Sequence, residues 1–151
     1  MIRLETSKKT GIDNDQDSEI STFQRNWSAE IPKLHPNAKP RTGMSSVYNC
    51  HGLTFASRRT GVLDPAGLRR ILKDDQWEEV KDVRDVLPGD IVVYFSDEGD
   101  ANHSGIVVAC EGDLYLPIVC SKWGHAGEYL HQLSDCPSLY GPVKKFYRCR
   151  L

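Results

Sequence analysis

The sequence predicts an α+β fold, because its helical and strand patterns occupy separate parts of a 151-residue chain. Helix signals come before residue 75, and apolar, β-branched runs bounded by turn residues come after residue 90. The composition, with 39% hydrophobic and 26% charged residues, is ordinary for a globular domain. We therefore expect helices first and an antiparallel meander second, built around one core.

Residues 1–45 are expected to form an N-terminal extension, and residues 46–151 the main domain. Three apolar residues in the extension have the spacing of one helical face, namely Ile20, Phe23 and Trp27. They predict a short helix over 17–28, capped by Asp17 or Ser18 and followed by a proline-containing extended segment. The pattern leaves open whether the extension is a mobile tail or a functional arm.

Two more helices are predicted at the start of the main domain. The first runs over 50–59, with Asn49 as its cap and Gly61 after its end. The second begins at Asp64-Pro65, because aspartate is a good N-cap and proline is tolerated at the first helical position.

The second half of the chain has the pattern of strands. A turn at 88–90 precedes the apolar run 91–95, which is typical of a buried strand. Further strands are expected over 104–110, 114–120 and 143–148. The short polar connections between the first three favour an antiparallel meander.

Charge and cysteine content narrow the class of protein. A net charge of −2 gives no electrostatic reason to expect binding to nucleic acid or to an anionic membrane. No apolar segment approaches the roughly 18 residues of a membrane span, and the N-terminus lacks the apolar core of a signal peptide. The five cysteines lack C-x-x-C spacing, so we expect free thiols, a cytoplasmic location, and no metal or other cofactor.

Cys50 and His103 are the candidate catalytic pair. A cysteine in the first turn of a helix is favoured as a thiolate, and the free N–H groups there can hold an oxyanion. Gly52 would let a substrate backbone approach closely. His103 begins a strand, where a general base is held rigidly yet faces a cleft. A buried structural role is the usual alternative for a free cysteine, and the pairing with His103 favours the nucleophile.

These motifs, Asn49-Cys50-His51-Gly52, then Pro88-Gly89-Asp90, then His103-Ser104-Gly105-Ile106-Val107, resemble those of the NlpC-type superfamily and related CHAP amidases. The resemblance covers residues 46–125. It implies a papain-like fold with N-terminal helices packed on a small antiparallel sheet. It also implies a cysteine peptidase or amidase with Cys50 as nucleophile and His103 as base, and a peptide or amide substrate, often derived from peptidoglycan.

The resemblance further implies a third polar residue that orients His103. The hairpin register places residues 120–122 opposite His103, where Ser121 is the polar candidate. His131 is preferred because it can lie on a neighbouring edge segment, and His125 is the other candidate. Family members carry a tyrosine upstream of the cysteine. That role falls here to Tyr48 or is absent, and His51 is expected to face substrate or solvent.

The sequence thus predicts a cysteine hydrolase that cleaves an amide or peptide bond through an acyl-enzyme on Cys50. The alternative is a catalytically inactive binding or regulatory module. A zinc site is not expected, because no two candidate ligands have close-pair spacing.

Overall fold

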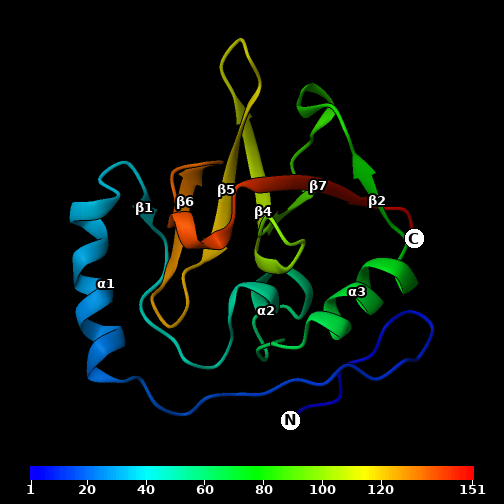
Figure 1. Ribbon diagram of the computed structural model, residues 1–151, viewed down its shortest axis with the longest axis horizontal. Helices are drawn as coiled ribbons and strands as arrows, with labels where there is room; N and C mark the ends of the chain where they lie inside the picture. Colours follow the sequence, from blue (N-terminus) through cyan, green and yellow to red (C-terminus); the bar gives the residue numbers. More distant parts are fainter.

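The structure, a computed structural model, describes residues 1–151 (Figure 1). Its helices are α1 (Thr22–Leu34), α2 (Cys50–Phe55) and α3 (Pro65–Asp74), with the 3-10 helices η1 (Val83–Asp85) and η2 (Ser138–Tyr140). Its strands are β1 (Lys39–Pro40), β2 (Trp77–Val80), β3 (Ile91–Phe95), β4 (Ala101–Glu111), β5 (Leu116–Lys122), β6 (Glu128–Gln132) and β7 (Val143–Cys149). In Figure 1, α1 lies beside β1, and α2 and α3 lie below the strands.

The expected fold, a papain-like arrangement of N-terminal helices packed on a small sheet, is wrong. All strands join a single seven-stranded antiparallel sheet in the order β1-β6-β5-β4-β3-β7-β2. Only three α-helices are present, and the chain before α1 is not helical. The sheet is larger than predicted because polar segments without strand periodicity, such as β1 and β2, pair at its two edges.

The central strands lie close to where the sequence predicts them. β3 pairs with β4 with Tyr94 opposite His103, and β4 pairs with β5 with Val107 opposite Val119. A register shift between Tyr94 and Phe95 marks a bulge at the start of β4. The candidate base therefore lies on the central strand of the sheet, beside a local irregularity.

Alternate residues of β3 enter different hydrophobic cores. Tyr94 belongs to the main core, which also contains Ile31 of α1. Ile91 and Val93 belong to a second core with Leu68 of α3. The sheet is thus covered on both faces, and side chains of β3 and β4 are fixed by packing from either side.

The first helix begins later than predicted, because Ser21, not Asp17 or Ser18, is its cap. The hydroxyl of Ser21 accepts from the N–H of Gln24 at 3.1 Å, and the side chain of Gln24 accepts from the N–H of Ser21 at 2.7 Å. This reciprocal pair is a capping box. The helix then continues past its predicted end to Leu34.

The other two helices begin where predicted. α2 starts at Cys50 and α3 at Pro65. α2 ends at Phe55, earlier than expected, because Ser57 and Arg58 have φ angles of 51° and 65° and cannot continue a right-handed helix.

The N-terminal residues pack along the base of the molecule (Figure 1). Asp15 and Gly61 exchange backbone hydrogen bonds of 3.0 and 2.7 Å. The hydroxyl of Thr6 donates to the buried carboxylate of Asp74 at 2.7 Å. The start of the 1–45 extension is therefore tied to the α2–α3 loop and to the end of α3.

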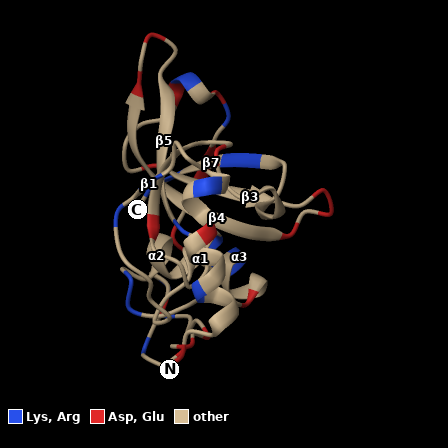
Figure 2. Ribbon diagram, turned by 90° about the vertical axis from the view of Figure 1, so that its left-hand side faces the viewer, with Lys and Arg blue, Asp and Glu red and all other residues tan.

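No helix of the structure has the length and apolar character needed to cross a membrane. Figure 2 shows basic and acidic residues along the ribbon without a long run of one sign.

Candidate active site

Cys50 is the first residue of α2, as predicted, and the side chain of Asn49 fixes that start. Asn49 Oδ1 accepts from the N–H groups of Gly52 at 2.9 Å and Val62 at 3.1 Å. Its amide donates to the Val62 carbonyl at 2.9 Å. The N–H groups of Cys50 and His51 have no acceptor within the helix, as in any first helical turn.

Gly52 is required for packing of α2. A Cβ at this position would lie 1.9 Å from the carbonyl oxygen of Thr60, so no other residue fits. Gly52 is buried beneath that carbonyl. Packing therefore explains why this residue is a glycine. Thr60 covers the side of Gly52 that was expected to meet substrate.

His103 lies on β4 within an aromatic environment. Its ring is stacked on Tyr140 of η2, with ring centroids 3.7 Å apart and planes 5° apart. Tyr94 lies 5.3 Å from the same ring at a tilt of 59°. His103 is 1% exposed, and its Nε2 atom is buried without a hydrogen-bond partner.

The thiol of Cys50 lies between two imidazoles. Burial raises the pKa of the thiol, but attraction to the side chains of His51 and His103, with hydrogen bonding to both, outweighs burial and holds the pKa well below its ordinary value. The predicted pair is therefore brought together.

His51 is part of this cluster and does not face solvent. It is 7% exposed, and its Nδ1 atom lies 2.8 Å from the hydroxyl of Ser104. Ser104 in turn donates to the hydroxyl of Thr54 at 2.9 Å. Burial lowers the pKa of His51, but the neighbouring thiol of Cys50 outweighs this and raises it. The residue expected to contact substrate instead interacts with the thiol of Cys50.

We predict that His51→Asn raises the pKa of the Cys50 thiol, because one of the two imidazoles that favour the thiolate is removed. The measurement is a pH titration of thiolate absorbance in the ultraviolet. His35→Asn is the matched control, since His35 pairs with Asp135 at 3.2 Å and is not among the groups that act on the thiol. An unchanged titration in His51→Asn would contradict the role of His51.

Neither candidate orienter from the sequence hydrogen bonds to His103. His131 Nε2 lies 2.7 Å from the hydroxyl of Ser121, and its Nδ1 lies 2.7 Å from the carbonyl of Gln132. Burial lowers the pKa of His131 to about 4, so its imidazole is neutral near pH 7. His125 is farther from the pair and bonds to Asp17 at 3.0 Å.

The hydroxyl of Ser121, the third candidate, also has hydrogen-bond partners other than His103. Its hydroxyl accepts from the indole N–H of Trp123 at 2.9 Å and bonds to His131. Ser121, His131 and Trp123 thus form a network of their own beside His103.

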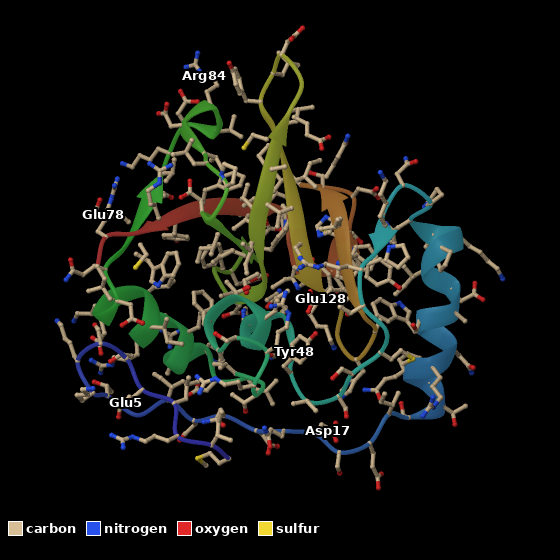
Figure 3. The ribbon with its side chains drawn as sticks, turned by 180° about the vertical axis from the view of Figure 1, so that it is seen from behind. Glu5, Asp17, Tyr48, Glu78, Arg84 and Glu128 are labelled. Atoms are coloured by element: carbon tan, nitrogen blue, oxygen red, sulfur yellow. The ribbon has the colours of Figure 1, made fainter.

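A buried ionic cluster flanks the site on the loop before α2 (Figure 3). Glu128 is fully buried and accepts from Arg58 at 2.6 and 3.0 Å and from the hydroxyl of Tyr48 at 2.5 Å. Figure 3 shows Tyr48 and Glu128 next to each other. Tyr48, expected to serve substrate, is therefore engaged by Glu128.

Lys122 is the third charged member of this cluster and is fully buried. Its ammonium donates to the carbonyls of Ser45 and Gly124, each at 2.6 Å, and lies 4.8 Å from the ring centre of Tyr48. Burial lowers the pKa of Lys122 to about 8, against the attraction of Glu128 and of the Cys50 thiol. Lys122 thus ties together the two loops that contain Ser45 and Gly124.

A cavity of about 280 Å³ lies next to the start of α2. It is lined by Asp15, Asp17, Ser46, Tyr48, Asn49, Gly61, Leu63, Gly124 and His125. Cys50 itself is 9% exposed. Asn49, the residue before Cys50, lines the cavity, whereas Cys50 and His103 do not.

Sequence reasoning missed three residues of this site: Tyr140, Glu128 and Lys122. In sequence, Glu128 and Lys122 look like surface residues. The signal that could have found them is that these two opposite charges flank a short loop. Tyr140 lies in a segment of no clear periodicity.

No group of three or more histidine, cysteine, aspartate or glutamate side chains is arranged to hold a metal ion. Comparison of the chain with protein families, curated proteins and solved structures finds no match.

Proposed function

We propose that the chain is a cysteine hydrolase that cleaves an amide or peptide bond through a covalent acyl-enzyme. The observation that carries this proposal is the Cys50 thiol, which begins a helix between two imidazoles that lower its pKa. The motif likeness to NlpC-type peptidases supports the same chemistry and favours a peptide substrate, with peptidoglycan-derived peptides among the candidates.

The proposed reaction has two steps. The imidazole of His103 takes the proton of the Cys50 thiol, and the thiolate sulfur attacks the carbonyl carbon of the substrate. The backbone N–H groups of Cys50 and His51 donate to the oxyanion. The carbon–nitrogen bond then breaks as the imidazolium protonates the leaving amine. Water, deprotonated by His103, attacks the thioester and releases the acid and the free thiol.

The alternative is a binding module without turnover. The low exposure of Cys50, at 9%, and the lack of a polar partner for His103 favour it. Both functions predict a perturbed thiol, so only turnover separates them. A module without turnover would label at Cys50 but would release no product.

We predict that Cys50 is alkylated by iodoacetamide at pH 6 faster than the exposed Cys149, because the two imidazoles favour its thiolate. Burial raises the pKa of Cys110, so that thiol should react slowly. Peptide mapping by mass spectrometry measures each rate. Faster labelling of Cys149 or Cys110 than of Cys50 in the folded protein would overturn the assignment of the nucleophile.

Turnover is tested with p-nitrophenyl acetate, an activated ester that needs no specific binding site. A hydrolase should release p-nitrophenol in a burst, acetylate Cys50, and then continue at a steady rate. Acetylation without a steady phase would favour the binding module.

A further inference from the structure

His103 lacks the polar partner that usually orients a catalytic histidine. In the Ser-His-Asp arrangement a buried carboxylate holds the ring in one tautomer and one orientation. Here Nε2 is buried without a partner, while His131 bonds to Ser121 and Gln132. An imidazole that rotates freely would spend part of its time with its proton-accepting nitrogen turned away from the thiol.

Tyr140 supplies a different constraint. The two rings are nearly parallel, 5° apart, with centroids 3.7 Å apart, which is full face-to-face contact. Both residues are almost completely buried, so the stack is not open to exchange with solvent. Tyr94 packs against the same imidazole, with an angle of 59° between the two ring planes. Rotation of the His103 ring out of its plane would collide with one of these tyrosines.

Tyr140 is itself held by the backbone around it. Its N–H donates to the carbonyl of Pro137 at 3.1 Å, which closes the 3-10 turn. Gly141 follows with a φ of 117°, and a Cβ there would lie 2.2 Å from the carbonyl of Phe95. This close approach fixes η2 against the end of β3, next to His103.

The charge of the proposed intermediate fits this arrangement. When His103 takes the proton of Cys50 it becomes a cation, and a cation is attracted by the face of an aromatic ring. Tyr140 also lies close enough to Cys50 for the thiolate to affect its pKa, which burial raises in the first place. The ring of Tyr140 thus contacts the base and lies near the nucleophile.

We infer that Tyr140 is the positioning residue of the site: its stacked ring, and not a third polar side chain, holds the imidazole of His103 toward Cys50. The inference rests on the proposed function, because it assigns the orientation of the proposed base. It assigns to Tyr140 the orienting role that the sequence had left among His131, His125 and Ser121.

The test compares Tyr140→Phe, which keeps the stacked ring, with Tyr140→Leu, which removes it. The readouts are the rate of Cys50 acetylation by p-nitrophenyl acetate and the thiolate absorbance. We expect Tyr140→Phe to stay within about two-fold of the wild-type rate and Tyr140→Leu to lose about ten- to hundred-fold. The matched control is Leu139→Ala, since Leu139 lies on the same 3-10 helix, is 72% exposed, and should leave the rate unchanged.

Equal rates in Tyr140→Leu and wild type would overturn the inference, and so would a loss in Tyr140→Phe as large as in Tyr140→Leu, because the hydroxyl would then be the group that matters. Circular dichroism checks folding, and Tyr140→Met replaces the leucine variant if the latter does not fold. ¹⁵N NMR of the His103 imidazole tests the inference independently of the proposed function. These shifts report its tautomer and ring order without turnover. They should change in Tyr140→Leu and not in Leu139→Ala, even if the wild type hydrolyses nothing.

Discussion

Replacing Cys50 by alanine should abolish hydrolysis and leave the sheet folded. The thiol is the only proposed nucleophile, so its removal stops the acyl-enzyme from forming. The side chain is small and lies at the first residue of α2, whose start is fixed by Asn49 and not by the sulfur. The activity measured is steady hydrolysis of p-nitrophenyl acetate, with circular dichroism as the check on folding.

His103→Ala should reduce the same rate by at least about 10³-fold, because nucleophile and base act as one unit. For the same reason the double variant should lose no more than Cys50→Ala alone. Cys149→Ala is the control, since Cys149 is exposed and lies at the end of β7, away from the site.

One result would assign the role of base to a different histidine of the site. If His103→Ala keeps the wild-type rate while His51→Asn loses it, then His51, oriented by Ser104 at 2.8 Å, is the base. Full activity in both variants would remove the imidazoles from the mechanism altogether.

The sequence placed Cys50 correctly at the start of α2 because the signals for that start are local. Asn49, Cys50 and the two residues after them contain the cap and the start of α2, and no distant contact is needed to read them. The central strands are equally predictable from local sequence, since a run such as 91–95 is apolar throughout and buried on both faces.

The fold as a whole was not predictable in this way. β2, with the sequence Trp77-Glu78-Glu79-Val80, has exposed acidic residues at its centre and becomes a strand only because β7 pairs with it. β1 is two residues long and contains a proline, which suits an edge strand. Such segments acquire their structure from a neighbouring strand, so local pattern gives no sign of them.

The site was only partly predictable for a related reason. Stacking of Tyr140 on His103 depends on where the loop after β6 returns to the sheet, and nothing in a one-dimensional pattern encodes that return. Only the pairing of the strands around His103 and Ser121 was inferred from sequence, and the observed pairing of β5 with β6 brings His131 to Ser121 and not to His103. Burial of Lys122 and Glu128 likewise follows from the loops that close over them.

Glu128→Gln should cost about 1–3 kcal/mol of unfolding free energy, because it removes the charged acceptor of Arg58 and the negative charge that attracts the buried Lys122. The Arg58 side chain is 43% exposed and keeps part of its solvation, which limits the loss. Glutamine has nearly the same shape, so the loss reports the charge and not a cavity. The matched control is Glu78→Gln. Glu78 pairs with Arg150 at 3.0 Å, but its side chain is 66% exposed (Figure 3), and an exposed pair contributes about 0–1 kcal/mol. Urea unfolding measures both values.

The pH dependence of this loss identifies the carboxylate as its source. Burial raises the pKa of Glu128, but hydrogen bonds from Arg58 and Tyr48 outweigh burial and lower the pKa below its ordinary value of 4.5. The carboxylate therefore contributes its full stabilisation above about pH 4.5, and this contribution is lost as the pH falls through the lower pKa of the folded protein. The difference in unfolding free energy between wild type and Glu128→Gln should accordingly be constant from about pH 5 to 7 and shrink in more acidic solution. A difference that persists unchanged at the lowest pH at which the protein folds would mean that packing of the side chain, and not its charge, holds the loop before α2 against β6.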